Sequence, residues 1–346
     1  MKRREDGTID PSSVAEEIGR RLKDAPVREA RQVGEMLITA YKLMEDELDL
    51  GQLKLLNHAM KEMRYAYKVF NEYPEARKVS IFGSARTPPD HPDYTSARSF
   101  GRKLAEKGWM AITGAGDGIM KAGHEGPTRE ASFGLRIRLP FETDANDVIQ
   151  GDPKLISFKY FFTRKLMFVS NSDAIAVYPG GFGTQDELFE SLTLIQTGKS
   201  DIMPVVLLQG REVDYWQRWE RGITDNLLER GWISPEDPGL YYIAPDEDAA
   251  IEHILRFYRR FHSARYVGDR YVMRLKSPLQ PAQVAELARE FDTIIEPGTL
   301  QQGGPLRGEK RELELTRLHF VHRRYRFGTL RRMIDHVNGF PLEEPE

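Results

Sequence analysis

The chain has 346 residues and contains no cysteine. Disulfide bridges, thiolate nucleophiles and thiolate zinc sites are therefore excluded, and a reducing, cytoplasmic location is expected. Long apolar runs are also missing. No window reaches the roughly 18 consecutive apolar residues of a membrane-spanning helix. The polar N-terminus, residues 1–5, lacks the apolar stretch of a secretion signal. We expect no membrane association.

A large excess of charge of either sign is absent as well. The chain has 50 Lys and Arg against 53 Asp and Glu, which gives a net charge of −3. General affinity for nucleic acid is therefore not expected, and any anion site must be local. The length suits one medium domain with accessory pieces.

Two sequence patterns predict the main parts of the chain. Residues 1–75 place apolar side chains three or four positions apart, which predicts a helical extension whose apolar faces pack on the main domain or on each other. Within residues 76–262, short apolar runs alternate with helical segments. The runs lie at 79–82, 109–112, 174–177 and 204–208, and the helical segments at 96–107, 160–170, 186–196 and 215–230. This alternation predicts an α/β class fold with a doubly wound, Rossmann-like parallel sheet, which binds ligands at the carboxyl ends of its strands.

Residues 263–346 break this alternation and predict a small α+β unit. A half-exposed strand is expected near 271–275, a helix at 281–291, a hairpin or mobile loop at 297–308, a strand at 312–320 and a helix at 329–337. Residues 317–332 hold six arginines and no acid, interleaved with aromatic residues. Two interpretations stay open: a basic face that is solvated or meets the acidic tail at 343–346, or a site for a phosphorylated effector or single-stranded nucleic acid. His319 and His322 have no second ligand cluster, so no metal site is expected there.

Three glycine-rich loops follow predicted strands. Glycine lets the backbone approach a ligand, and the N–H groups at a helix N-terminus attract anions. Three such loops at one sheet edge predict a nucleotide phosphate site. Neither a complete Gly-x-Gly-x-x-Gly nor a Gly-Lys-Ser/Thr sequence is present, which argues against a nicotinamide enzyme and a P-loop nucleotidase. The substrate-binding candidates are glycines and small hydroxyl residues: Gly83, Ser84, Thr113, Gly114, Gly116, Gly180, Gly181, Gly183 and Thr184.

The stretch from Pro179 to Glu187 resembles the Pro-Gly-Gly-x-Gly-Thr-x-x-Glu signature of the LOG (lysine-decarboxylase-like) family. The pair Arg164-Lys165 resembles the family's Arg-Lys element, and residues 139–142 and 192–199 resemble segments of its longer bacterial members. The resemblance covers roughly residues 76–260. Ala115 departs from it, since many relatives have glycine there, and Asp117 and Phe161-Phe162 also differ. These departures bear on the preferred base more than on the reaction.

The resemblance implies a phosphoribohydrolase that releases a free base and ribose 5-phosphate from nucleoside 5′-monophosphates, with no metal or organic cofactor. Cleavage of the ribosyl C–N bond builds positive charge on the sugar, and a fixed carboxylate such as Glu187 stabilises that charge. Arg164 offers a planar fork that binds phosphate or orients Glu187. Glu187 and Arg164 are thus the expected catalytic residues. Lys165 is expected to support Arg164 or to face the anionic side of the ligand.

Two other functions compete with this enzyme hypothesis. A nucleotide or pterin-phosphate binding protein of the same fold needs the glycine loops but not the pair Arg164 and Glu187. A DNA-handling protein is suggested only by the C-terminal arginines, and the negative net charge weighs against it. Similar domains form dimers with active sites near the interface, so a homo-oligomer, dimeric or of higher even number, is expected. The C-terminal unit is expected to regulate the enzyme or to make an oligomer contact.

Overall fold

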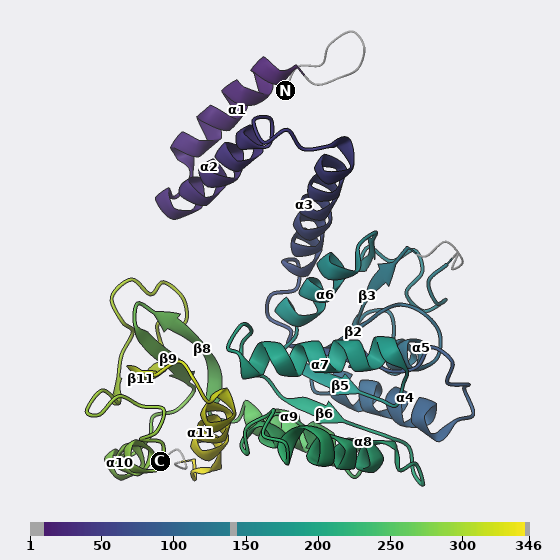
Figure 1. Cartoon of the computed structure of the whole chain (residues 1–346), viewed down its shortest axis with the longest axis vertical. Helices are drawn as coiled ribbons and strands as arrows, with labels where there is room; N and C mark the ends of the chain where they lie inside the picture. Colours follow the sequence, from purple (N-terminus) through teal and green to yellow (C-terminus); the bar gives the residue numbers. More distant parts are fainter. Residues whose placement is uncertain (1–9, 139–143, 343–346) are drawn as a thin grey trace. The chain divides into compact units, whose positions relative to one another are not determined.

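The computed structural model describes residues 10–138 and 144–342 and divides into two compact units between Lys61 and Glu62 (Figure 1). The first unit contains α1 (Pro11–Asp24), α2 (Val27–Lys42) and the beginning of α3 (Leu50–Phe70). The Asp10 carboxylate caps α1 by accepting a hydrogen bond from the Ser13 N–H at 3.1 Å, as expected for an N-cap residue. Helix α2 buries none of its side chains in the described part of the chain, so its predicted apolar face is exposed.

The end of α3 belongs to the larger unit. Ala66, Val69 and Phe70 are buried in the core of that unit, and the Phe70 ring stacks on Phe133 with 4.6 Å between the ring centroids. The helical extension was predicted to end at residue 75, whereas the division between the two units lies at 61/62. Apolar spacing continues without a break along α3, so the sequence pattern does not reveal which core each turn joins.

A seven-stranded sheet forms the centre of the larger unit, and all its neighbouring strands are parallel. Its order is β4-β3-β2-β1-β5-β6-β7. The strands are β1 (Lys78–Phe82), β2 (Met110–Thr113), β3 (Ser132–Ile137), β4 (Leu155–Phe158), β5 (Ala174–Val177), β6 (Val205–Leu207) and β7 (Tyr242–Ile243). Every residue of β1, β2, β5 and β6 is buried, which suits strands covered on both faces. The predicted doubly wound sheet is confirmed.

Five helices lie between these strands along the chain, and a sixth follows β7. They are α4 (Pro92–Ala105), α5 (Ile119–Glu125), α6 (Phe161–Ser170), α7 (Phe182–Gln196), α8 (Tyr215–Ile223) and α9 (Glu247–Phe257). Helix α8 continues into a π-helical turn, Thr224–Leu228, so the helix expected over 215–230 is regular only in its first half. Within residues 10–138 and 144–342, no helix is both long and apolar enough to cross a lipid bilayer.

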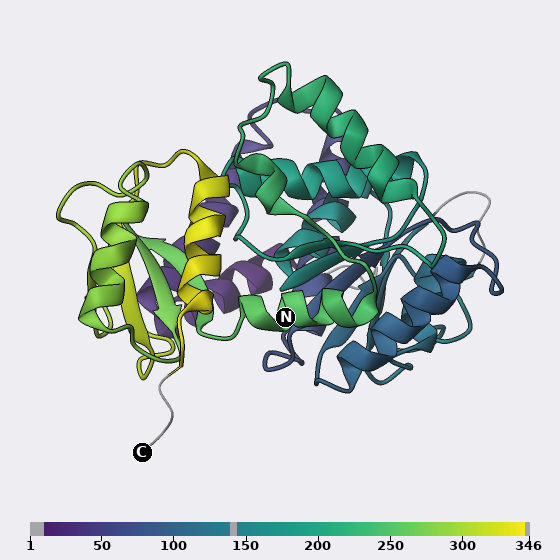
Figure 2. The ribbon, with the colours of Figure 1, turned by 90° about the horizontal axis from the view of Figure 1, so that it is seen from below.

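A second, antiparallel sheet has the order β10-β11-β9-β8 and lies beside α10 (Pro281–Glu290) and α11 (Phe327–Gly339) (Figure 2). Its strands are β8 (Phe261–Val267), β9 (Arg270–Leu275), β10 (Gln301–Gly303) and β11 (Thr316–Val321). The predicted small α+β unit is confirmed. Met273, Leu318 and Ile334 belong to the same continuous core as the first sheet. The two sheets therefore share one core, and the boundary predicted at residue 262 falls within β8.

The arginine-rich segment is only partly the exposed basic face that one interpretation expected. Arg317 is fully buried, and its Nε lies 2.9 Å from Oε2 of Glu309. Arg331 is also buried, bridges to Asp335 at 3.0 Å and lies over the ring of Phe257. The four remaining arginines, at 323, 324, 326 and 332, are exposed. The acidic tail at 343–346, the suggested partner of this segment, lies outside the described residues.

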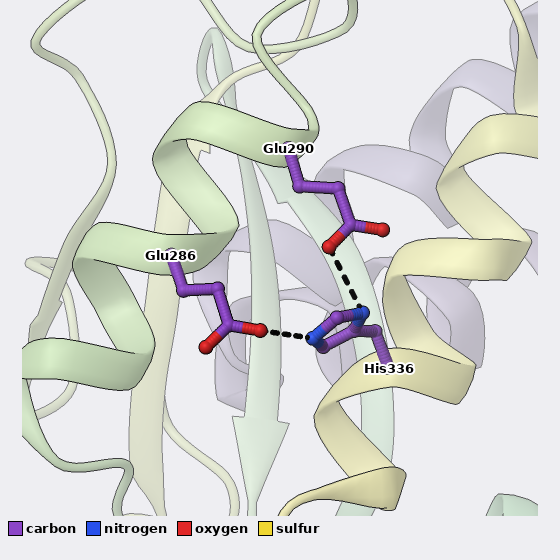
Figure 3. A group of neighbouring side chains, drawn as sticks. All are labelled: Glu286, Glu290 and His336. Atoms are coloured by element: carbon purple, nitrogen blue, oxygen red, sulfur yellow. Dashed lines mark hydrogen bonds and ion pairs between the residues drawn. The ribbon is translucent and has the colours of Figure 1, made fainter.

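Helices α10 and α11 are joined through His336 (Figure 3). Its Nε2 lies 2.8 Å from a Glu286 carboxylate oxygen, and its Nδ1 lies 3.2 Å from a Glu290 carboxylate oxygen. In the described part of the chain, Glu286, Glu290 and His336 form the only group of three or more His, Cys, Asp or Glu side chains that lie close enough together to share a metal ion. Each ring nitrogen faces a different carboxylate of α10. We therefore interpret this group as a contact between two helices.

Candidate functional site

The candidate site lies where the order of the parallel sheet reverses. Strand β1 pairs with β2 on one side and with β5 on the other, so the connections that leave these strands diverge to opposite sides. Ligands of doubly wound sheets bind in the crevice that forms at such a point, beyond the carboxyl ends of the strands. All three predicted glycine-rich loops lie there, after β1, β2 and β5.

Backbone hydrogen bonds hold the three loops together. Ser84 in the first loop donates its N–H to the carbonyl of Pro179 at 3.0 Å. The carbonyl of Ser84 accepts the N–H of Ile119, which begins α5, also at 3.0 Å. Ser84 thus connects the loop after β1 to both neighbouring loops, so their relative positions are fixed before any ligand binds.

Two glycines are required by close packing of these loops. A Cβ atom on Gly83 would lie 2.6–2.7 Å from three atoms of the Ile119 side chain. A Cβ atom on Gly180 would overlap the side chain of Thr184. Both positions therefore need glycine to let backbone segments approach one another.

Gly181 and Gly183 have a different role because a Cβ atom on either would meet nothing within 4 Å. Gly181 is the N-cap of α7, no side chain caps this helix end, and its first turn contains no acidic residue. The first N–H groups of an α-helix have no partner within the helix. The start of α7 therefore presents free donors and a positive dipole end beside open space, which is a suitable environment for a phosphate.

These loops enclose a cavity of about 650 Å³, a volume in the usual range for small-molecule sites. Nine of the twelve predicted site residues line it: Gly83, Ser84, Gly114, Gly116, Arg164, Gly181, Gly183, Thr184 and Glu187. The sequence prediction therefore identified most of the wall. The cavity also contacts Arg86, Met120, Phe161 and Phe182, which were not predicted as site residues. The glycine signal marks phosphate loops, but it does not indicate which larger side chains complete the wall.

Thr113 and Gly180 support the loops from outside the cavity. The Thr113 hydroxyl accepts the Ala115 N–H at 3.0 Å and lies 3.0 Å from Nε2 of His124. Complete burial lowers the pKa of His124, which keeps the ring neutral in this network. The Gly180 carbonyl accepts a hydrogen bond from the Tyr215 hydroxyl at 2.6 Å. Both residues were predicted to bind substrate, and their observed contacts are with protein groups.

Lys165 also differs from the prediction. Its Nζ lies 2.8 Å from a carboxylate oxygen of Asp186 and 2.8 Å from one of Glu190. Its side chain lines a different cavity. Neighbouring residues of a helix point about 100° apart, so Arg164 and Lys165 on α6 face different surroundings. Lys165 therefore joins α6 to α7 and lies outside the cavity that Arg164 lines.

Glu187 is the buried acid of the cavity, with only 6% of its surface exposed. A carboxylate oxygen of Glu187 lies 3.9 Å from Nη2 of Arg164. Burial raises the pKa of Glu187 to about 7, although Lys165 and Arg164 act in the opposite direction. A carboxyl group that changes protonation near neutral pH is suited to proton transfer or to stabilising a cation.

Ala115 retains the backbone conformation of a residue that is glycine in many LOG relatives. Its φ is +63°, in the left-handed region where glycine has no steric penalty. The methyl group is buried beside Ala145 and Ile149. Alanine at this position is therefore accommodated by packing of its methyl group.

Comparison of the sequence with known proteins identifies the family of this chain. The sequence model of a family described as "Possible lysine decarboxylase" matches residues 112–254. The cytokinin riboside 5′-monophosphate phosphoribohydrolase of Mycobacterium tuberculosis is 30% identical over 162 residues, which cover 45% of this chain and 82% of that protein. The chain belongs to the LOG family.

Other LOG proteins show the same partial coverage of this chain. The cytokinin riboside 5′-monophosphate phosphoribohydrolase LOG3 of Arabidopsis thaliana is 27% identical over 174 residues, which cover 49% of this chain and 77% of that protein. Among solved structures, a molybdenum cofactor carrier protein from Chlamydomonas reinhardtii matches 53% of this chain and 98% of its own, with 22% identity and a TM-score of 0.37.

The segment at 139–142, which resembles longer bacterial LOG proteins in sequence, lies outside the residues that the structure describes.

Proposed function

We propose that this LOG-family protein hydrolyses the N-glycosidic bond of nucleoside 5′-monophosphates and releases a free base and ribose 5-phosphate. The observation that carries the proposal is the position of Glu187 in α7. The N-cap of this helix is Gly181, no side chain caps it, and Gly181, Gly183 and Glu187 line the same cavity. A phosphate at the start of α7 places the attached ribose within one helical turn of the carboxylate. A related activity in relatives supports the reaction class.

The proposed chemistry separates charge in a site that excludes much of the solvent. As the ribosyl C–N bond breaks, the bonding electrons leave with the base, and positive charge develops on the sugar. The ionised Glu187 carboxylate stabilises that charge and accepts a proton from the attacking water. The water oxygen bonds to the anomeric carbon, and the base takes up a proton from solvent. Preorganised electrostatic groups of this kind contribute large parts of enzymatic rate enhancements.

Arg164 is proposed to hold both the phosphate and Glu187. Its guanidinium group lies 5.0 Å from the centre of the Phe161 ring and 3.9 Å from Glu187. Phe161 lines the cavity and is half-exposed, so it offers an aromatic surface to the base. We propose that the phosphate binds at the α7 end, the ribose beside Glu187 and the base on the Phe161 side.

A panel of nucleoside 5′-monophosphates and the matching nucleosides tests the proposed function. We expect ribose 5-phosphate and free base from at least one monophosphate without added metal. The matching nucleoside should be a poor substrate because the loops bind the phosphate. Equal turnover of AMP and adenosine would contradict the proposed site. Tight binding of monophosphates with no turnover of any of them would instead favour a non-catalytic nucleotide-binding protein.

A further inference from the structure

A second cavity, of about 540 Å³, lies within the larger unit beside other faces of α6 and α7. Its wall combines these helices and residues 198–203 with Arg265, Tyr266 and Tyr271 of the second sheet, and with Phe327 at the start of α11. We infer that this cavity is a second, non-catalytic binding site for a phosphorylated ligand that carries a planar ring, the chemistry of a nucleotide. The volume is adequate for such a ligand.

Uncompensated positive charge beside the cavity favours an anion. One carboxylate, Glu309, lies 2.9–3.0 Å from the guanidinium groups of Arg265, Arg274 and Arg317. Two positive charges in this cluster are therefore not balanced by Glu309. The Nε atoms of Arg265 and Arg274 are buried and have no hydrogen-bond partner in the described parts of the chain. A buried polar atom without a hydrogen-bond partner is costly, and Arg265 extends this cluster to the cavity wall.

Other charged groups at the cavity leave the balance positive. Lys199 is exposed and forms no salt bridge with the residues that the structure describes. The guanidinium group of Arg324 lies 5.0 Å from the ring centre of Tyr266. Of the two acids in the wall, Glu190 shares the positive charge of Lys165 with Asp186, and burial raises the pKa of Asp201, which disfavours its charged form. The local field therefore attracts phosphate groups.

Aromatic side chains in the same wall favour a ligand with a ring. Tyr266, Tyr271 and Phe327 all line the cavity, and Tyr266 is partly exposed. The Tyr266 hydroxyl is held 2.7 Å from Nδ1 of His322, so its ring has a fixed position. Nucleotide bases of every type can stack on aromatic rings such as that of Tyr266. Cations beside a rigid aromatic surface are the combination that distinguishes a nucleotide from inorganic phosphate.

The second cavity also contacts the residues that flank the candidate catalytic acid. Lys165 and Glu190 line it, and Lys165 bridges to Asp186, the neighbour of Glu187 on α7. The positive charge of Lys165 lowers the pKa of Glu187. A ligand in the second cavity is therefore placed to change the electrostatic environment of the first one, although its binding does not depend on the proposed reaction.

Equilibrium dialysis of the full chain with labelled GTP tests this site, and inorganic pyrophosphate serves as a competitor that has the charge without the ring. We expect Lys199→Glu and Arg265→Met each to weaken GTP binding at least tenfold. Lys107→Met, at an exposed lysine on the α4–β2 turn, is the matched control and should bind GTP normally. Gly183→Ala in the first cavity should also bind GTP normally. Pyrophosphate should compete more weakly than unlabelled GTP.

Three outcomes would overturn the inference. The first is a lack of measurable GTP or pyrophosphate binding by the wild-type chain. The second is GTP binding that Gly183→Ala weakens and Lys199→Glu does not, which would place GTP in the first cavity. The third is equal loss of binding in Lys199→Glu and Lys107→Met, which would indicate nonspecific attraction. Lys199 is exposed and forms no salt bridge with described residues, so Lys199→Glu keeps the test valid if Arg265→Met impairs folding.

Discussion

At the scale of single residues, the account depends on the ionisation of Glu187. Its pKa is raised to about 7 by burial, and the proposed chemistry needs the ionised form. We therefore predict that kcat/KM for AMP rises as pH increases through about 7, since kcat/KM reports ionisation in the free enzyme. A stopped assay of ribose 5-phosphate release between pH 5 and pH 9 measures this profile.

The substrate phosphate also ionises, near pH 6, so the profile needs a control. AMP binding to Glu187→Gln reports the contribution of the phosphate alone, because that variant has no carboxyl group at position 187. A kcat/KM that falls as pH rises through 7 would show that the protonated acid is the working form. The assignment of Glu187 as the cation-stabilising carboxylate would then be wrong.

Gly183 provides a test in which stability and function should change in opposite directions. A Cβ atom at this position meets nothing within 4 Å, and alanine is favoured over glycine in a helix by about 0.5–1 kcal/mol. Gly183→Ala should therefore be as stable as the wild type or slightly more stable. Its kcat/KM for AMP should fall about tenfold or more, because the methyl group enters the proposed phosphate space. Thermal unfolding and kinetics on one preparation measure both effects.

Gly83→Ala is the contrasting variant, because its Cβ atom would lie within 2.7 Å of Ile119. It should lose stability as well as activity. Normal kcat/KM in Gly183→Ala would place the phosphate elsewhere in the cavity.

At the scale of the elements, Glu309 stabilises the second sheet by connecting β8, β9 and β11 through three arginines. Burial favours a higher pKa, but hydrogen bonds from Arg317, the Leu306 N–H and Arg274 lower the pKa of Glu309 to about 2. The lowered pKa means that its stabilising contribution is complete above about pH 4.5 and is lost as pH falls towards 2. This part of the fold should therefore be sensitive to acid.

We predict that Glu309→Gln destabilises the protein by about 3–5 kcal/mol at neutral pH, the usual cost of removing one partner from a buried ion cluster. Denaturant unfolding at pH 7 and pH 3 measures the effect, and the difference from wild type should shrink at the lower pH. Glu314→Gln, at an exposed acid of the same loop, is the control. Equal stability of the two variants at pH 7 would contradict the role of Glu309.

The elements that the sequence predicted well are those with unambiguous local patterns. Strand β5 is a short, continuous apolar run, β1 has a single serine among its apolar residues 79–82, and the glycine signature marks the beginning of α7. Strand β3 was not predicted because Ser132, Gly134 and Arg136 interrupt its apolar residues. Helix α5 has only seven residues, too few to show a helical period.

The candidate site was predictable where a residue type has one physical use, as at Gly181 and Gly183. The sequence did not indicate that Arg164 and Lys165 line different cavities, because neighbouring side chains of a helix point in different directions. The buried Arg317 was also not identifiable, since its partner Glu309 comes from a loop without a sequence signal. Such pairings depend on tertiary packing alone.

At the scale of the whole molecule, we predict a homodimer or a higher even-numbered oligomer. Phe182 is 97% exposed at the edge of the cavity, and Phe161, Phe162 and Leu166 on α6 are each about half-exposed. Association with a second copy would cover such exposed apolar side chains, and closed two-fold assemblies are the most frequent. Light scattering at micromolar concentration measures the mass. A monomer would contradict this prediction. Phe182→Asp tests whether the exposed Phe182 side chain lies in the interface.

The central claim is that Glu187 acts on the ribosyl bond of a nucleotide held by the three glycine loops. The most direct test is the rate of ribose 5-phosphate release from AMP by Glu187→Gln relative to wild type, with AMP affinity measured on the same samples. The wild type should release adenine and ribose 5-phosphate in equal amounts. Glu187→Gln should bind AMP with similar affinity and react at least about 100-fold more slowly. A variant that retains near-normal turnover would contradict the account.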